Sequence, residues 1–343
     1  MESDRAPHAG GNRSVSAADV AHRAPSRRQA VAGGVAVIAA SALLTGCSGR
    51  PRRLQASRSD ADDQPRTDPA LVKYAQGETI RCSVASPAGI AIGPSGVLWI
   101  AGDGALVRRL ADGSEARYRF TGQASCVAAG KNRAYVGIDD HIVEVTVGGG
   151  QARIWPSLGP KSVVTCIAVG NDGLFIADAG ERRIISVSAD RTVHGYLCEK
   201  DADRGYSGLI VPSPHLDVAV ASDGSVHVAN PGKHLIEVYE PDGSPRWSWG
   251  EETQEMAGFC GCCNPTDFAL MADGRYVTAE KGIPRVKVYT KDGHFDCVVA
   301  GPEALSPGVV GLDVAAFADE RIAVLDPGIS AVRVFVPKEA ERA

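Results

Sequence analysis

Three cysteines lie within four positions of the segment GFCGCCNP, residues 258–265: Cys260, Cys262 and Cys263. A thiolate is both a nucleophile and a soft metal ligand, so this group favours three kinds of chemistry. The cysteines could bind a metal or cluster, form structural disulfides, or act as a redox-active pair at Cys262 and Cys263. Alternate residues of an extended loop point in opposite directions, so all three thiols share one ion only if Gly261 bends the chain.

The N-terminal sequence indicates export, which decides the redox environment of these thiols. The segment SRRQAVAGGVAVIAASALLTGC joins Arg27 and Arg28 to an uncharged stretch, residues 30–44, and ends at Cys47. It resembles a twin-arginine translocation signal closed by a bacterial lipobox. The apolar run is shorter than the roughly 20 residues of a spanning helix, which favours a processed signal over an uncleaved anchor. We therefore expect a lipoprotein of the cell envelope, anchored to a membrane by lipidated Cys47 and periplasmic or otherwise extracytoplasmic.

The chain is expected to contain four segments. Residues 1–46 are the signal, 47–71 a flexible tether, 72–338 a folded domain and 339–343 a tail. The tether is rich in Arg, Asp, Ser and Pro and cannot bury enough apolar surface to order itself. The formal net charge of -5, with no basic cluster interleaved with aromatic residues, argues against a nucleic-acid partner, and we expect a monomer.

Six stretches of the domain repeat one pattern: a short alternating strand, a turn often built on Asp-Gly or Ser-Gly, and a second strand. The second residue of each stretch, here called the marker position, falls at 89, 126, 166, 217, 267 and 313. Successive markers are 37, 40, 51, 50 and 46 residues apart. Most stretches continue into a third strand, as in LIEVYEPDG and RVKVYTKDG. This spacing predicts an all-β, six-bladed β-propeller with four-stranded blades.

The register of the repeats predicts a ring of polar side chains. The residue two positions after each marker is alanine in all six repeats, and a large apolar residue stands between them. Because strand side chains alternate, marker and alanine share one side, which we expect to be the side with less room. The markers are Gly89, Cys126, Cys166, Asp217, Asp267 and Asp313. The loop with three cysteines precedes Asp267, so five sulfurs are expected to converge on one channel mouth.

Thiolates there would select an iron–sulfur cluster, copper or zinc, although CGCC is not a standard spacing for zinc ribbons or ferredoxins. Without Cys47 the chain has eight cysteines, the even number that disulfide pairing would give. The three aspartates form a channel-mouth acidic ring, which either caps backbone amides or supplies oxygen ligands to Ca²⁺, a metal we favour less. Further pocket candidates are His215, Asn264, Arg204, Tyr206 and Lys281.

The repeats resemble NHL repeats, which form six-bladed propellers. In FIADAGERRIISV, Asp178 and Arg183 are spaced as in the NHL pattern Asp-x-x-Asn-x-Arg, with Glu181 in place of the usual Asn. The segments PSPHLDVAV, FCGCCNP and EKGIPRVKVY are also similar to exported bacterial NHL-type lipoproteins with a CGCCNP motif, a resemblance that assigns no activity. Enzymes on related propellers, such as streptogramin lyases, draw histidines from channel loops, and the sequence contains no comparable multi-blade set.

Three functional hypotheses follow. The first is a cysteine-lined channel mouth that binds a metal or iron–sulfur cluster for electron transfer or metal handling, with an envelope redox protein as partner. The second is a non-catalytic propeller that binds a protein or ligand and is braced by disulfides. The third is a divalent-metal-dependent lyase or hydrolase at the acidic ring. The residue pattern alone does not decide whether the protein is an enzyme.

Elemental analysis and thiol counting on mature protein purified without oxygen separate these hypotheses. Stoichiometric iron, copper or zinc should be lost when Cys260, Cys262 and Cys263 are all replaced by Ser, if the loop is a ligand site. Metal-free protein with paired thiols would instead leave a disulfide-braced binding propeller.

Overall fold

The structure is a computed structural model that describes residues 66–149, 152–203 and 206–339. The chain divides into two units, Met1–Ala56 and Ser57–Ala343, and only the second contains described residues. The expected signal, the lipidation site Cys47 and most of the tether lie outside them. Within the described ranges, no helix is long and apolar enough to cross a membrane.

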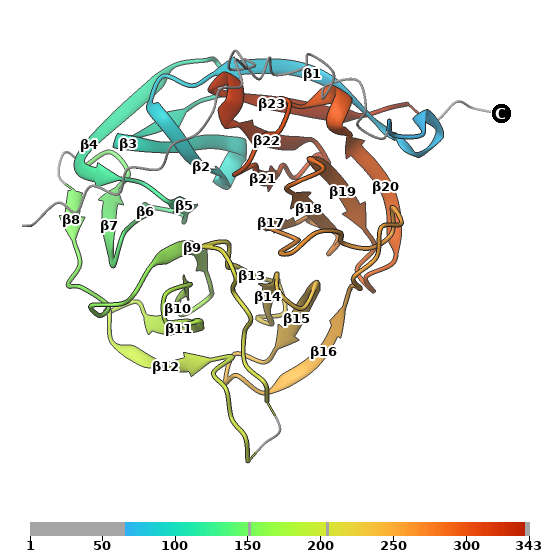
Figure 1. The fold of residues 1–343 in the computed structure, drawn as a ribbon. Helices are drawn as coiled ribbons and strands as arrows, with labels where there is room; N and C mark the ends of the chain where they lie inside the picture. The colour runs from blue at the N-terminus through green and yellow to red at the C-terminus, as the bar shows by residue number, and fades with distance from the viewer. Residues whose placement is uncertain (1–65, 150–151, 204–205, 340–343) are drawn as a thin grey trace, which may run out of the picture. The chain divides into compact units, whose positions relative to one another are not determined.

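The second unit consists of six small antiparallel sheets arranged in a ring, as the blades of a β-propeller (Figure 1). The inner strands of blades 1 to 6 are β2 (Ala85–Gly93), β5 (Cys126–Ala129), β9 (Val164–Val169), β13 (Asp217–Val220), β17 (Asp267–Leu270) and β21 (Asp313–Ala316). The second strands of blades 2 to 6 are β6 (Arg133–Ile138), β10 (Gly173–Asp178), β14 (Val226–Asn230), β18 (Tyr276–Glu280) and β22 (Ile322–Asp326). The third strands are β7 (His141–Thr146), β11 (Arg183–Ser188), β15 (Leu235–Tyr239), β19 (Arg285–Tyr289) and β23 (Ala331–Pro337). The outer strands of blades 2 to 5 are β8 (Ala152–Ile154), β12 (Val193–Leu197), β16 (Pro245–Trp249) and β20 (Phe295–Ala300).

Blade 1 follows the same plan with one long strand in place of two. The first part of β3 (Val97–Arg109), as far as Asp103, pairs with β2, and the part from Ala105 pairs with β4 (Glu115–Gln123). Gly104 lies between the two parts at φ 65°, a left-handed conformation that glycine adopts without steric cost. Four short 3₁₀ helices complete the described secondary structure: η1 (Pro69–Leu71), η2 (Pro94–Gly96), η3 (Pro302–Ala304) and η4 (Pro327–Ile329).

The ring closes between segments from opposite ends of the chain. Strand β1 (Tyr74–Arg81) is the outer strand of blade 6 and pairs antiparallel with β23, the last strand (Figure 1). Ile80 of β1 is buried in one core cluster with Val332 and Val334 of β23. The prediction of a six-bladed propeller with four-stranded blades is confirmed.

Side chains on an inner strand alternate between the two neighbouring blades. In blade 3, Cys166 and Ala168 pack with Val218 of blade 4, whereas Ile167 packs in a cluster with Trp155 on the side of blade 2. The other blades divide in the same way, with the large residue toward the preceding blade and the alanine toward the following one. The invariant alanine therefore allows adjacent blades to approach closely, as dense interior packing requires.

Removing side-chain volume from the closing strand should destabilise the whole ring. We expect Ile80→Ala to lower the free energy of unfolding by about 2 to 5 kcal/mol, because it leaves a cavity against β23. The matched control is Thr79→Ala on the exposed side of the same strand, which should change it little. Urea unfolding followed by circular dichroism measures both, and equal effects would contradict a stabilising role for the buried face of β1.

Candidate functional site

The marker side chains connect the inner strand of one blade to that of the next. Four of the six reach the backbone of the residue that follows the marker in the next blade. The bonds are Cys166 Sγ to Val218 O at 3.4 Å, Asp217 Oδ2 to Phe268 N at 2.6 Å, and Asp267 Oδ1 to Val314 N at 2.8 Å. Asp313 likewise accepts a hydrogen bond from the Ile90 amide of blade 1. The three aspartates therefore cap backbone amides, which is one of the two interpretations of the acidic ring.

Blade 1 has glycine at the marker position because the backbones approach too closely for a side chain. A Cβ atom on Gly89 would lie 2.9 Å from the Cα atom of Cys126 in blade 2. Real Cβ atoms do not tolerate that separation from a backbone carbon, so this contact requires glycine. All six markers thus take part in contact between adjacent inner strands.

The aspartates and His215 also line one cavity of about 300 Å³ at the channel mouth. Burial raises the pKa of Asp217 to about 6, although hydrogen bonds from its neighbours favour the charged form. Burial and then the charges of the other aspartates raise the pKa of Asp267 and Asp313 well above the usual range. Burial and the charge of Lys281 lower the pKa of His215 to about 4, so this imidazole is neutral at pH 7.

Cys126 and Cys166 line the channel but belong to the packing between blades. Cys126 is buried, its sulfur lies 3.8 Å from Ser125 Oγ, and burial raises its pKa to about 12. Burial and then the charge of Asp217 raise the pKa of Cys166. Both thiols are therefore protonated at neutral pH, the form that binds soft metals poorly.

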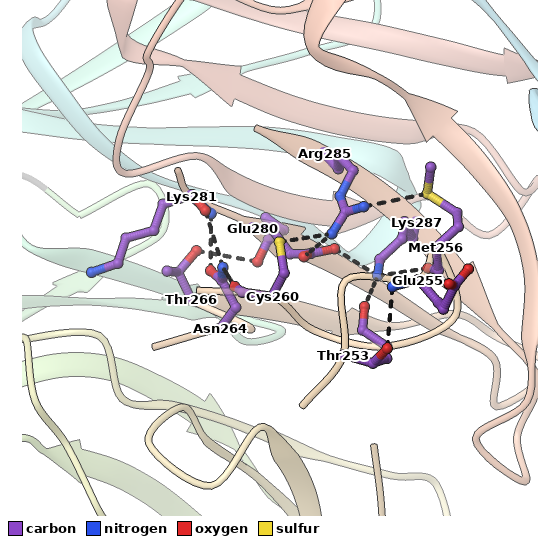
Figure 2. Close-up of polar contacts among 12 residues, drawn as sticks. Thr253, Glu255, Met256, Cys260, Asn264, Thr266, Glu280, Lys281, Arg285 and Lys287 are labelled. Carbon is purple, nitrogen blue, oxygen red and sulfur yellow. Dashed lines mark hydrogen bonds and ion pairs between the residues drawn. The ribbon is translucent and has the colours of Figure 1, made fainter. Parts of the chain in front are cut away.

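The cysteine loop is tied to blade 5 by a buried charged cluster (Figure 2). Glu280, at the end of β18, pairs with Arg285 Nη2 and with Lys287 Nζ, each at 2.6 Å. Lys287 Nζ also donates to Gly258 O at 2.7 Å and to Met256 O at 3.1 Å. Burial lowers the pKa of Lys287 to about 8, opposed by the adjacent carboxylate. Two loop carbonyl groups thereby obtain partners inside the protein.

This cluster is a variant of a hydrogen-bonding arrangement that recurs in other blades. The buried residue that ends the second strand bonds the loop crossing from the preceding blade. The bonds are Asp178 with Val163 N at 2.9 Å and Ser162 Oγ at 2.9 Å, Asn230 with Ile210 N at 2.9 Å, and Asp326 with Ser306 N at 3.1 Å. In those blades the side chain accepts from loop amides. In blade 5 the loop presents carbonyls instead, so a lysine donates to them and Glu280 neutralises it.

Asn264 fixes the two ends of the cysteine segment. Its Nδ2 donates to Cys260 O at 2.5 Å and to Lys281 O at 3.0 Å, and its Oδ1 accepts from Lys281 N at 2.9 Å. Between these anchors Gly261 adopts φ 85°, so the chain bends. Cys260 Sγ accepts a hydrogen bond from Arg285 Nη2 at 3.2 Å, as Figure 2 shows.

Cys262 and Cys263 form a close vicinal pair, with their Sγ atoms 3.1 Å apart. Cys262 is exposed and Cys263 is 1% exposed. Ser213 Oγ donates to Cys263 Sγ at 3.3 Å, and Lys281 Nζ donates to Ser213 Oγ at 2.8 Å. Burial opposes ionisation of Cys263, but hydrogen bonds from Lys281, Ser213 and Cys262 outweigh it and hold its pKa below the usual value. The hydrogen bond and charge from Cys263 in turn raise the pKa of Cys262.

The five predicted sulfurs therefore divide into the vicinal pair, Cys260 beside Arg285, and two thiols between blades. In the part of the chain that the structure describes, no group of three or more His, Cys, Asp or Glu side chains is arranged to hold a metal ion. All eight cysteines in the described ranges carry free thiols.

Of the remaining predicted pocket residues, Tyr206 is not part of the channel mouth. Arg204 lies outside the described residues. Tyr206 lines a separate pocket of about 350 Å³ with Tyr239 and Trp247, which shares no lining residue with the mouth cavity.

Sequence reasoning missed Ser213, Glu280, Arg285 and Lys287. Glu280 had a usable signal, because it stands 13 residues after its marker (280 − 267), as Asn230 and Asp326 do (230 − 217 and 326 − 313). Ser213 had none, because its contact joins residues 50 positions apart.

No protein-family model matches this chain, and no curated protein matches it. Solved structures do resemble it in fold. A streptogramin B lyase structure is 11% identical, with a TM-score of 0.55, and the match covers 79% of this chain and 100% of that one. A chain of the mitotic checkpoint complex is 13% identical, with a TM-score of 0.56 and coverage of 84% and 100%. The WD40 β-propeller domain of Doa1 is 14% identical, with a TM-score of 0.52 and coverage of 78% and 98%.

The buried carboxylates predict an unusual pH dependence of stability. Because folding raises the pKa of Asp267, the folded state holds its proton more tightly than the unfolded chain, whose aspartates titrate near pH 4. The stabilisation that the Asp267 carboxyl contributes is therefore present at low pH and declines as pH rises through the pKa that this group has in the folded protein. Asp267→Asn keeps an acceptor for Val314 N–H and removes the charge, so its stability relative to wild type should increase from pH 4.5 to pH 8.

Urea unfolding at the two pH values measures this difference. The control is Asp292→Asn, the same change at an exposed turn position, which should follow wild type. An identical pH dependence in both variants would show that Asp267 is not held protonated by the fold.

Proposed function

We propose that the protein is an exported, lipid-anchored NHL-type propeller that carries out thiol–disulfide exchange through Cys262 and Cys263 at its channel-mouth face. One observation carries the proposal: an exposed thiol lies 3.1 Å from a buried sulfur whose ionisation Ser213 and Lys281 promote. Cysteines with a lowered pKa beside a second cysteine are typical of redox-active sites. Lysine near the buried sulfur supplies the positive charge that such sites need.

The arrangement assigns different steps to the two thiols. Cys263 is too buried to meet a substrate, so Cys262 attacks the substrate disulfide while its proton passes to the Cys263 thiolate. The first substrate thiolate leaves and takes that proton. Cys263 then attacks the sulfur of Cys262, and the second substrate thiolate leaves and is protonated by water. The substrate disulfide is reduced to two thiols, and the protein dithiol is oxidised to one disulfide.

The partner is proposed to be an envelope protein. Four apolar side chains on connections between strands at the channel-mouth face are 40 to 57% exposed: Val163, Ile210, Val310 and Ile329. Val310 also lines the mouth cavity. Exposed apolar side chains on the same face as a reactive thiol favour a protein surface over a small polar disulfide. Propellers of similar fold include a WD40 domain and a chain of a multiprotein complex, which supports a binding role.

Copper handling is the second candidate function, favoured by the same short sulfur separation. Thiolates select Cu(I), and two sulfurs from one loop provide a starting ligand pair. Structural zinc needs four ligands and iron–sulfur clusters are held by four cysteines, more than the vicinal pair supplies. A lyase at the acidic ring has less support, because Asp217 and Asp267 are already bonded to backbone amides.

Exchange kinetics test the proposed site. Reduced wild-type protein should react with 5,5′-dithiobis(2-nitrobenzoate) in a fast phase that Cys262→Ser abolishes. Lys281→Met should slow this phase roughly tenfold at pH 7, because less Cys263 is ionised to accept the proton of Cys262. The control Lys291→Met, at an exposed turn, should react as wild type does.

Two results would contradict the proposal. One is a fast phase that survives Cys262→Ser, and the other is a rate that Lys281→Met leaves unchanged. Stoichiometric Cu(I) retained by wild type against a chelator and lost in Cys262→Ser would favour the copper function instead.

A further inference from the structure

Exchange at the vicinal pair alone does not explain why the buried Arg285 donates a hydrogen bond to Cys260. Arg285 is 4% exposed, and its Nη2 donates both to Glu280 Oε2 at 2.6 Å and to Cys260 Sγ at 3.2 Å. Its Nη1 lies 3.7 Å from Met256 Sδ (Figure 2). Sulfur in a neutral thiol or thioether is a weak acceptor, whereas a thiolate is a strong one.

The three charged side chains of this cluster carry one positive charge in excess. Lys287 and Arg285 bring two positive charges, and Glu280 brings one negative charge. The other partners of Lys287 are the neutral carbonyls of Met256 and Gly258. Buried charges in proteins are normally paired, because an unpaired one loses its hydration without compensation. The Cys260 sulfur is the other acceptor that Arg285 Nη2 reaches.

Cys260 is also within reach of Cys262. A single residue separates them, so their Cα atoms lie at most about 7 Å apart, and a bend shortens that distance into the range of a disulfide. Gly261 supplies the bend at φ 85°. A Cβ atom there would meet only Asn264 Nδ2, at 3.7 Å, so the peptide has space to turn. Cys260 is half-buried and Cys262 is exposed.

We propose that Cys260 is a resolving cysteine that takes over the disulfide from the vicinal pair, so that the oxidised loop holds a Cys260–Cys262 bond. The inference rests on the proposed exchange function and adds a third thiol to it. Cys260 attacks Cys262 Sγ, a new sulfur–sulfur bond forms, and the Cys262–Cys263 bond breaks. Cys263 leaves as a thiolate, and no proton or electron is exchanged with solvent.

The direction of this step follows from the contacts of Cys263. A vicinal disulfide removes the charge that Ser213 and Lys281 stabilise, whereas a Cys260–Cys262 bond restores it. Sulfurs that are more stable as thiolates are better leaving groups in exchange. Ser213 donates to Cys263 Sγ, and Lys281 donates to Ser213, so Cys263 is the better leaving group of the pair.

Differential labelling of the oxidised protein tests the proposal. Full-length protein is equilibrated with oxidised and reduced glutathione, quenched in acid with N-ethylmaleimide, reduced and treated with iodoacetamide. Fragmentation of the peptide that contains all three cysteines then locates each label. We expect maleimide mainly on Cys263 and carbamidomethyl on Cys260 and Cys262. Maleimide mainly on Cys260 would overturn the proposal, because the vicinal disulfide would then be the final state.

Variants separate this step from the first exchange. Cys260→Ser should release the first substrate thiol at the wild-type rate but retain the vicinal disulfide. Arg285→Lys keeps a cation opposite Glu280 but weakens the hydrogen bond that favours a free Cys260, so it should shift the remaining maleimide from Cys260 to Cys263. Met256→Leu removes the other sulfur near Arg285 and should leave the label distribution of wild type. An Arg285→Lys distribution equal to wild type would show that the arginine does not act through Cys260. If no cysteine is oxidised at any glutathione ratio, the exchange function itself fails, a result distinct from label on Cys260.

Discussion

The propeller depends on side chains of one inner strand that bond the backbone of the next. Asp217 and Asp267 accept amide protons across a blade boundary, and the Cys166 thiol donates across another. Inner strands of adjacent blades share no ladder of hydrogen bonds, so these contacts give each blade a defined neighbour at the axis. They also require close approach, which explains the alanines two positions later and the glycine at position 89. The cost is desolvation of carboxylates, seen in their raised pKa values.

Two unusual groups of contacts build the candidate site. One is the buried cluster of Glu280, Arg285 and Lys287, which replaces the simple acceptor that other blades place under the crossing loop. The other is the contact of Ser213 and Lys281 with Cys263, which joins loops of blades 4 and 5. Because one contact holds the near end of the cysteine segment and the other its far end, the three sulfurs have separate environments. Separate environments allow separate chemical roles for three identical thiols.

Much of the fold could be predicted from the sequence, because a repeated strand pattern with a regular spacing has few structural solutions. The same repeat also placed the aspartates in one ring. The expected convergence of five sulfurs is not seen. Alternation along a strand predicts which side chains share a face, but it does not predict what that face packs against. In a propeller both faces of an inner strand pack against neighbouring blades, so Cys126 and Cys166 lie in the packing between blades. Arg285 and Ser213 were missed because loop conformation and long-range contacts, not local spacing, bring them to the cysteines.

The closing strand has a consequence for how the chain can be synthesised. Tyr74 pairs with Pro337, so the blade that completes the ring joins residues 263 positions apart (337 − 74). A ribosome must release almost the whole domain before β1 has a partner, and until then both β1 and β22 present an unpaired edge. Closure therefore has to wait until β23 has left the ribosome. A nascent chain that ends before residue 331 would lack β23, and its β1 would remain an open edge available to other strands.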